Sequence, residues 1–135
     1  VYDTMWHSTE AVAGAVASAF SEAGYAIRML SLQHNHISDI MTEILEADYI
    51  CVGSPTLNNG MLPTVSAFLT YMKGLAPKGR KALAFGSFGW GGQSIGQVEE
   101  ILASCKFDLL KQHKIQYIPD DKQLEEVTAQ TISQL

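Results

Sequence analysis

Apolar side chains recur every three to four residues in five stretches of the chain, the spacing that places them on one face of an α-helix. The first helix is expected from Ser8 or Thr9 to Gly24, and the second is expected to be capped by Ser38. Pro63 and Gly74 mark the start and the end of a third, and Asp120 and Asp121 cap the fifth. The predicted apolar faces are Val12, Ala13, Val16, Ala17 and Phe20; Ile40, Met41, Ile44 and Leu45; Val65, Phe68, Leu69 and Met72; Ile95, Val98, Ile101 and Leu102; and Leu124, Val127, Ile132 and Leu135.

Short apolar runs alternate with these helices and indicate β-strands. The run at 49–53, Tyr-Ile-Cys-Val-Gly, is typical of a central strand that is covered on both faces. Further strands are expected at 25–32, 82–85 and 115–118. Residues 1–2 run directly into a turn-like Asp-Thr, so we interpret them as the end of a first strand in a fragment of a larger protein.

This alternation over 135 residues predicts one α/β domain with a five-stranded, doubly wound parallel sheet and helices on both faces. In such sheets ligands bind beyond the carboxyl ends of the strands, where the strand order reverses. The loops that follow the first, third and fourth strands are therefore the candidates for a site.

Composition and charge exclude several kinds of partner. No apolar run approaches the ~20 residues of a membrane span, and 47% of the residues are hydrophobic, which suits a soluble domain. A net charge of −5 without a Lys/Arg cluster disfavours nucleic acid and anionic membranes. Cys51 and Cys105 form no CxxC or zinc pattern and are expected to be buried, reduced thiols, which suits a cytoplasmic protein.

The loop Thr4–Thr9 combines hydroxyl, imidazole and backbone N–H groups at the start of a helix, where an anion is favoured. No Lys or Arg precedes Arg28, so a phosphate here would be held by neutral donors. The GxxxxGK[ST] and GxGxxG patterns are absent, which disfavours ATP and NAD. Taken alone, Ser8 and Thr9 could equally be an ordinary helix cap.

Two further loops suit a planar ligand. In the loop Ser54–Gly60, the Asn-Asn-Gly segment 58–60 can adopt positive φ and bring backbone groups to the edge of a ligand. The loop Ser87–Gly92 places Trp90 among three glycines, so the indole can lie beside an aromatic ring. Each loop alone could be an ordinary turn, but three such loops at one sheet edge favour a shared site.

The three loops resemble those of the flavodoxin-like domain of the flavodiiron proteins (A-type flavoproteins), through residues 2–9, 52–60 and 85–92. The resemblance spans the whole chain and implies non-covalent binding of flavin mononucleotide (FMN). It implies that the phosphate is wrapped by Thr4, Met5, Trp6, His7, Ser8 and Thr9. It implies that the isoalloxazine and ribityl chain meet Ser54, Pro55, Thr56, Leu57, Asn58, Asn59 and Gly60, and that the ring is covered by Ser87, Phe88, Gly89, Trp90, Gly91 and Gly92.

The same resemblance implies a redox domain of an oxidoreductase that is not a complete enzyme by itself. Its electrons would come from a rubredoxin or a flavin reductase and pass to a diiron site that reduces oxygen or nitric oxide. That site belongs to an N-terminal β-lactamase-like domain which this chain lacks, and a head-to-tail homo-oligomer is implied for the full protein. The histidines at 7, 34, 36 and 113 are scattered, so no metal site is expected here.

Some points stay open at the sequence level. His7 stands where many relatives carry glycine, so its imidazole could contact the phosphate or the solvent. The Gly60 carbonyl near the flavin N5 could stabilise the one-electron-reduced state, while the acidic chain and an apolar ring pocket would lower the second potential. The alternatives are a free-standing flavodoxin, a flavin NAD(P)H:quinone reductase, and a signalling module such as a phosphoacceptor receiver. A receiver needs an Asp closing the third strand, where the sequence is Val52-Gly-Ser-Pro, and Asp3 is the one acid at that sheet end.

Overall fold

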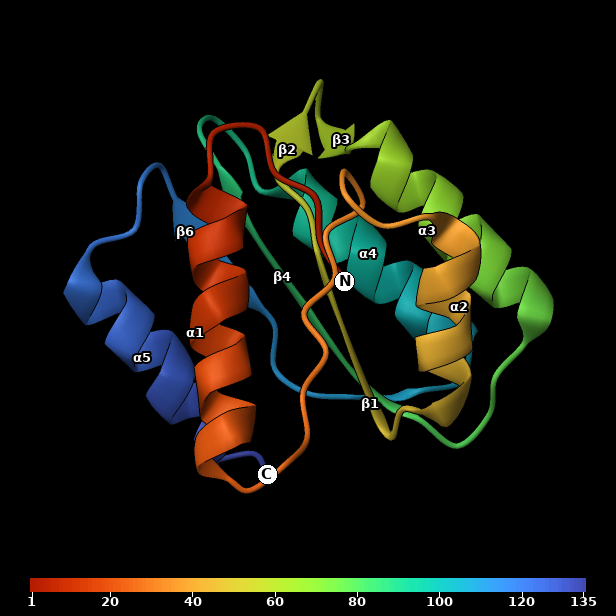
Figure 1. The fold of residues 1–135 in the computed structure, drawn as a ribbon. Coiled ribbons are helices and arrows are strands. Elements are labelled where there is room, and N and C mark those ends of the chain that lie inside the picture. The colour runs from red at the N-terminus through yellow and green to blue at the C-terminus, as the bar shows by residue number, and fades with distance from the viewer.

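The computed structural model describes residues 1–135 and shows a parallel sheet between helices (Figure 1). The helices are α1 (Ser8–Glu22), α2 (Ile37–Glu46), α3 (Pro63–Leu75), α4 (Gln93–Ser104) and α5 (Asp121–Ile132). The strands of the sheet are β1 (Tyr49–Gly53), β4 (Lys81–Phe88), β5 (Asp108–Leu109) and β6 (His113–Gln116), and a separate hairpin consists of β2 (Thr56–Leu57) and β3 (Gly60–Met61). The predicted α/β class is confirmed.

The longest strand, β4, lies at the centre of the sheet. It pairs in parallel with β1 on one side and with β5 and then β6 on the other. Tyr2 makes parallel bridges to Gly53 and to Ser31. The order across the sheet is therefore Ser31, Tyr2, β1, β4, and β5 with β6. All five predicted positions exist, but the first two in this order are each reduced to a single bridging residue.

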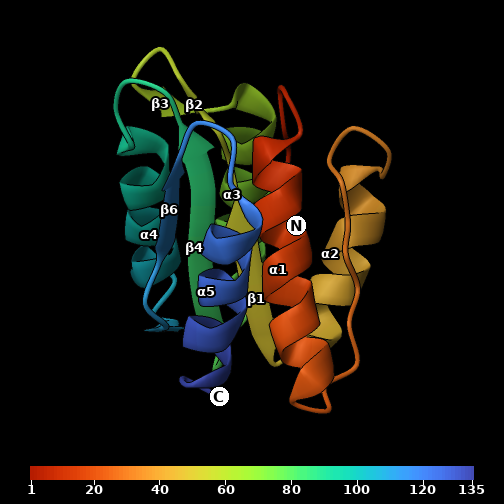
Figure 2. The same ribbon diagram turned by 90° about the vertical axis from the view of Figure 1, so that its left-hand side faces the viewer.

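The prediction of a strand at residues 25–32 is wrong. Residues 25–29 have no sheet pairing (Figure 2 shows this segment running beside α2). Only Ser31 forms a bridge to Tyr2, in which the Leu30 carbonyl accepts from the Tyr2 N–H at 3.1 Å. Apolar side chains favour a strand, but a strand also needs a partner for its backbone groups. Val1 and Tyr2 are too short a partner, so the segment stays extended and unpaired.

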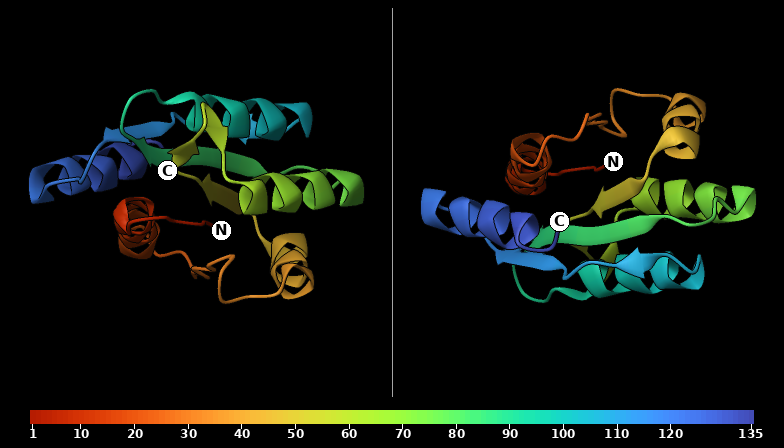
Figure 3. Two further views of the ribbon diagram at one scale, coloured as in Figure 1. Left: turned by 90° about the horizontal axis from the view of Figure 1, so that it is seen from above. Right: turned by 90° about the horizontal axis from the view of Figure 1, so that it is seen from below.

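The core lies on both faces of the sheet. Ile50 and Val52 belong to a cluster packed against α2, α3 and α4, whereas Leu83 and Phe85 belong to a cluster packed against α1 and α5. Figure 3 shows the sheet seen along its edge between the helices. This confirms the prediction of helices on both faces. No helix combines the length and the apolar composition that crossing a bilayer requires.

Helix ends differ from the prediction at two places. His36, not Ser38, caps α2, because its Nδ1 accepts a hydrogen bond from the Ser38 N–H at 3.2 Å. Gly74 lies inside α3, which ends when Ala76 adopts a left-handed conformation with φ 49°. Asp120 does cap α5, accepting from the Gln123 N–H at 2.8 Å. Of the predicted apolar helix faces, the residues that are exposed or lie beyond their helix are Leu45, Ile132 and Leu135.

Strand ends differ as well. β4 continues three residues past Phe85, to Phe88, so the first part of the third predicted loop belongs to a strand. β6 ends at Gln116 because Tyr117 turns into the left-handed region with φ 59°, and Ile118 is exposed. The predicted strand at 115–118 is therefore half wrong, because a residue with positive φ ends sheet pairing.

Cys51 and Cys105 are free thiols, but each is only partly buried, contrary to the expectation of full burial. Cys51 borders the gap between β1 and residues 25–30. Its apolar surroundings raise the pKa of the thiol to about 12. Cys51 is therefore protonated and unreactive at neutral pH.

His113 on β6 is a buried histidine whose Nε2 lies 2.9 Å from the Thr131 hydroxyl oxygen on α5. Burial lowers the pKa of His113 below its ordinary 6.5, and the charge of Lys111 lowers it further. The folded state thus disfavours the charged ring. The stabilising contribution of neutral His113 is complete above pH ~6.5 and is lost as the pH falls from there toward the folded pKa.

We expect the free energy of unfolding to fall below pH ~6.5, with a slope from His113 of at most about 1.4 kcal/mol per pH unit. His113→Gln should reduce this slope, whereas the control His34→Gln, in an exposed turn, should not. Urea denaturation at pH 7.5 and 5.5 measures it. The same pH dependence in all three proteins would rule out His113 as its source.

Candidate functional site

Four loops gather at the carboxyl ends of the strands, the upper edge in Figure 1. They are residues 3–7, the β2–β3 hairpin, residues 88–92 and residues 117–120. The first three were predicted from the sequence, and the fourth was not. Ligands of doubly wound sheets bind at this end.

The N-terminus of α1 presents a row of free backbone donors. None of the N–H groups of residues 5–10 donates a hydrogen bond within the chain, and the first to do so is that of Ala11, to the His7 carbonyl at 3.0 Å. No side chain caps this helix. Free N–H groups and the helix macrodipole together favour a bound anion. The loop therefore has the donors that a phosphate group requires, without a cation.

Thr4 adds a side-chain donor to this row. The residue is buried, and its Oγ1 has no hydrogen-bond partner. Leaving a buried hydroxyl unpaired costs about 1–3 kcal/mol, so such groups are rare. The Thr4 hydroxyl is thus placed to bind an acceptor supplied by a ligand.

Asp3 fixes the base of the same loop. Its buried carboxylate accepts hydrogen bonds from the Thr4 N–H at 2.7 Å, from Gln33 Nε2 at 2.7 Å and from the Thr64 hydroxyl. Gln33 also donates to the Thr4 carbonyl, at 2.8 Å. The first loop, the turn after Ser31 and α3 are therefore tied together at one carboxylate. Gln33 and Thr64 carry no sequence signal that would have identified them.

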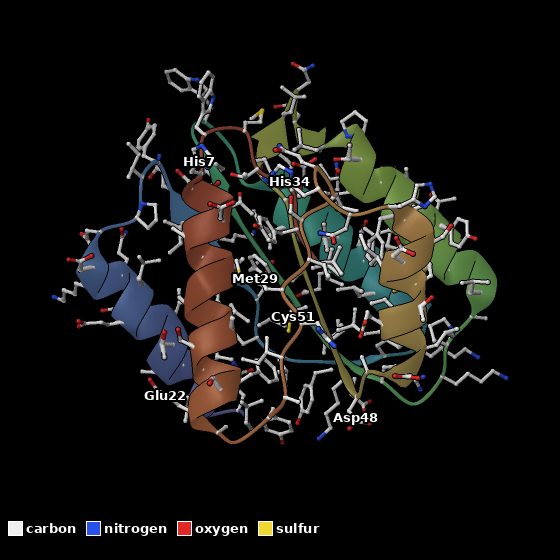
Figure 4. All side chains as sticks on the ribbon, in the orientation of Figure 1. His7, Glu22, Met29, His34, Asp48 and Cys51 are labelled. Atoms are coloured by element: carbon white, nitrogen blue, oxygen red, sulfur yellow. The ribbon has the colours of Figure 1, made fainter.

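His7 precedes α1 in the left-handed conformation, with φ 69° and ψ 0°. This region is unfavourable for residues with a Cβ and is adopted most easily by glycine. The side chain is 82% exposed, and its Nδ1 lies 3.6 Å from a carboxylate oxygen of Glu10. In Figure 4 His7 lies at the N-terminal end of α1. The imidazole thus faces Glu10 and solvent.

His7→Gly is expected to raise the free energy of unfolding by up to about 1 kcal/mol, because glycine adopts this conformation without strain. The matched variant His7→Ala removes the ring but keeps the Cβ, and should destabilise the chain slightly. Urea denaturation compares the two. If both variants lost the same stability, the ring and its contact with Glu10 would matter rather than the backbone.

The second loop forms a β-hairpin instead of the irregular loop expected. Asn58 and Asn59 occupy its two-residue tip with φ 49° and 64°, as predicted for this segment, but Gly60 does not have positive φ. Gln97 on α4 holds the tip: its Oε1 accepts from the Met61 N–H at 3.1 Å, and its Nε2 donates to the Asn59 carbonyl at 3.2 Å. Gln97 is a further site residue that the sequence pattern did not reveal.

Several hydroxyl groups join the loops to one another. Thr9 Oγ1 lies 2.8 Å from Ser87 Oγ, and Thr56 Oγ1 lies 2.7 Å from Ser94 Oγ. Ser54 is fully buried at the base of the hairpin, and its hydroxyl bonds only to backbone groups there. In this structure these hydroxyls hold the loops in position. The backbone of the loops forms the edge of the site.

Two tryptophans protrude from different loops at this edge. Trp90 is 99% exposed and Trp6 is 84% exposed. Tyr117 and Ile118 of the fourth loop are exposed as well. Exposed aromatic side chains gathered at one edge mark a binding surface. The other predicted residues on these loops are Met5, Ser8, Pro55, Leu57, Phe88, Gly89, Gly91 and Gly92.

The arrangement suits a ligand with a phosphate at one end and a planar aromatic ring at the other. The phosphate donors lie at α1, and the aromatic and glycine-rich segments lie on the neighbouring loops. No group of three or more His, Cys, Asp or Glu side chains could hold a metal ion.

Comparisons with known proteins agree with this geometry. The flavodoxin family model matches residues 1–130. The rubredoxin-oxygen oxidoreductase of Megalodesulfovibrio gigas is 42% identical over 135 residues, which cover 98% of this chain and 34% of that protein. A nitric oxide reductase of Moorella thermoacetica is 39% identical over 126 residues, covering 92% of this chain and 32% of the relative.

The solved structure of a flavodoxin from the domain Archaea superimposes with a TM-score of 0.88 at 25% identity, covering 98% of this chain and 91% of that one. The chain therefore spans about a third of the two curated relatives (34% and 32%) and nearly the full length of this smaller protein.

Proposed function

The chain belongs to the flavodoxin family, whose members bind FMN, and we propose that it holds FMN at the loop edge and transfers electrons through it. The observation that carries this proposal is the row of free N–H groups at residues 5–10 next to the unpaired Thr4 hydroxyl. Both are donors without an acceptor, and the FMN phosphate supplies acceptors. The residues present fit the cofactor.

The phosphate would be held by neutral donors alone. The backbone of Met5 to Glu10 and the Thr4 hydroxyl would surround it, and the α1 macrodipole would offset its charge. Asp3 keeps Thr4 in place and does not itself face an anion, since its oxygens are occupied by three donors. The loop thus selects a phosphate monoester by geometry rather than by net charge.

The ring would lie between the tryptophan-bearing loops and the β2–β3 tip. Trp90 and Trp6 are free to pack on a planar ring and exclude water from it. Gln97 holds the Asn59–Gly60 peptide at the tip, where its backbone groups can meet the polar edge of the ring. Bound FMN supplies one-electron and two-electron redox chemistry, and the protein sets its potentials.

The partners proposed for the full protein rest on its relatives. A rubredoxin or a flavin reductase would donate electrons, and a diiron domain that reduces oxygen or nitric oxide would accept them. The names of the two relatives support rubredoxin as a donor and oxygen or nitric oxide as the substrate that is reduced, and the chain covers 34% and 32% of their lengths. We further propose a head-to-tail homo-oligomer for the full protein and a cytoplasmic location, in keeping with two free thiols.

A free-standing electron carrier is the second candidate, because the archaeal flavodoxin is covered over 91% of its length. Both candidates use the same FMN site. Two mixing experiments distinguish them: the oxidised, FMN-loaded chain is mixed with reduced rubredoxin, and the chain after stepwise reduction is mixed with a separately prepared, oxidised diiron domain. Electron transfer to the diiron domain favours the first candidate, and loaded FMN that cannot be reduced in one-electron steps would contradict both.

Gly60→Ala tests the role of the hairpin tip. A Cβ at Gly60 would lie 3.1 Å from the flexible end of the Gln97 side chain, so the variant should fold and bind FMN within about threefold of wild type. Restricting the Asn59–Gly60 peptide should shift the first one-electron potential, measured by spectroelectrochemistry. Gly74→Ala, inside α3, is the control. Unchanged potentials in Gly60→Ala would remove Gly60 from the mechanism.

A further inference from the structure

Non-glycine residues with positive φ are concentrated at the loop edge. Six such residues occur in the chain. Ala76 ends α3 and Lys106 follows the end of α4, positions where a left-handed residue is common. The other four lie in the loops at the carboxyl ends of the strands: His7, Asn58, Asn59 and Tyr117. Away from helix ends, the left-handed conformation of non-glycine residues is therefore confined to the candidate site.

Tyr117 is the least expected of these four. Asparagine adopts the left-handed conformation easily, whereas positive φ in a bulky residue is a genuine outlier. Tyr117 has a φ of 59°, and 60% of its surface is exposed, so burial in the core does not offset the strain. Strained backbone is found most often at ligand sites. The compensation must come from the contacts that this conformation allows.

These contacts join the loop after β6 to the loop that carries Trp90. The Tyr117 N–H donates to the Phe88 carbonyl at 2.7 Å, and Gln116 Nε2 donates to the Gly89 carbonyl at 3.2 Å. A Cβ added at Gly89 would lie 3.7 Å from Cε1 of Tyr117, so the tyrosine ring packs against this glycine. The two residues that precede Trp90 are thus both held from the end of β6.

The Trp90 loop has little other support. Three of its residues are glycines, and Trp90 is 99% exposed. Outside the pairing of β4 with β6, the bonds from Gln116 and Tyr117 are the only hydrogen bonds that reach residues 88–92 from a segment distant in sequence. The supporting loop is itself fixed at its far end, where Asp120 and Gln123 cap α5 reciprocally. A well-anchored loop therefore holds a flexible one.

We propose that Tyr117 is a positioning residue for the flavin ring, because it holds the Gly89–Trp90 segment where the indole packs on the ring and excludes water. This inference rests on the proposed FMN site and adds to it a residue that acts through a neighbouring loop. Apolar cover disfavours charge on the ring, so the same support lowers the second one-electron potential. The phosphate end of the site, at α1, is not involved.

Tyr117→Gly tests the proposal, because glycine relieves the backbone strain and removes the ring. The thermal unfolding midpoint of the free chain should be at least that of wild type. The affinities for FMN and for riboflavin should both fall by the same factor, about threefold to tenfold, and the second potential of bound FMN should rise. A merely structural role would instead lower the midpoint together with the affinity. Tyr117→Phe keeps the ring and should behave as wild type.

Lys106→Gly is the matched control, since Lys106 also has positive φ, 62°, but is exposed beyond the end of α4. It relieves the same kind of strain and should leave the affinity for both flavins unchanged. A further measurement needs no flavin. Because the N–H of residue 117 bonds to Phe88, its protection from hydrogen exchange in the free chain should fall at least about threefold in Tyr117→Gly.

Three results would overturn the role of Tyr117 while leaving the FMN site intact. They are wild-type affinity for riboflavin in Tyr117→Gly, a loss of affinity for FMN alone, and equal losses in Tyr117→Phe. Failure of the proposed function is recognised separately, in the wild-type chain. If the folded wild type bound neither flavin, the FMN site would be wrong and this inference with it.

Discussion

Thr4→Val is expected to weaken FMN binding by about tenfold to a hundredfold while leaving the free chain at least as stable as wild type. The hydroxyl is buried without a partner in the free chain, so replacing it with a methyl group removes an unpaired polar atom of similar size. With FMN bound, the same change removes a hydrogen bond to a charged phosphate, worth about 1.5–3 kcal/mol. The two effects have opposite signs, which a merely structural role would not produce.

Urea denaturation without cofactor and an FMN titration followed by flavin fluorescence measure the two effects. Thr42→Val is the matched control, since its hydroxyl bonds only to the Ser38 carbonyl of its own helix, at 3.2 Å on the exposed face of α2. The control should leave FMN affinity unchanged. Affinity retained in Thr4→Val would show that the hydroxyl does not face the phosphate.

Asp3→Ala is expected to lower the free energy of unfolding by about 3–5 kcal/mol, the range for removing one partner from a buried charged network. Three donors would lose their acceptor at once: the Thr4 N–H, the Gln33 amide and the Thr64 hydroxyl. FMN affinity should fall as well, because Thr4 and the donor row above it would lose their anchor. The loss of FMN affinity would then come from displacement of the Thr4 loop, because Asp3 itself does not contact the cofactor.

Asp108→Ala, an exposed position on β5, is the control for removing one negative charge. Asp3→Asn separates shape from charge, since the amide keeps one oxygen for the Thr4 N–H and should recover part of the lost affinity. Urea denaturation and FMN titration are measured on all three variants. If Asp3→Ala had the same free energy of unfolding as Asp108→Ala, the hydrogen bonds to Asp3 would not hold the loop.

The alternation of helices and strands was readable from the sequence because it depends on local periodicity. The buried faces of α1, α3 and α4 follow from apolar spacing alone, and Val12, Phe68 and Val98 are fully buried as predicted. The strand prediction for residues 25–32 failed because strand pairing does not depend on local periodicity. Its composition suits a strand, but pairing depends on a neighbour far away in sequence, and Tyr2 supplies only one bridge.

The sequence predicted the loops of the site but not the residues that hold these loops in place. Glycines, asparagines and tryptophans in loops carry a conformational or chemical signal, so the three predicted segments lie at one edge of the sheet. Gln33 and Thr64 bond to the first loop, 29 and 61 residues away, and Gln97 bonds to the hairpin, 36 and 38 residues away. Nothing in their local sequence indicates these roles. Contacts of this kind are fixed only by the fold.

The comparison of FMN with riboflavin, titrated into the same purified chain, tests the proposed site most directly. The two ligands share the ring and differ only in the phosphate, so the difference in affinity reports the donors of residues 5–10 and Thr4. We expect FMN to bind at least about 10³-fold more tightly than riboflavin, corresponding to about 4 kcal/mol from several charge-assisted hydrogen bonds. Equal affinity for the two ligands, or no binding of FMN by the folded chain, would contradict the phosphate site at the N-terminus of α1.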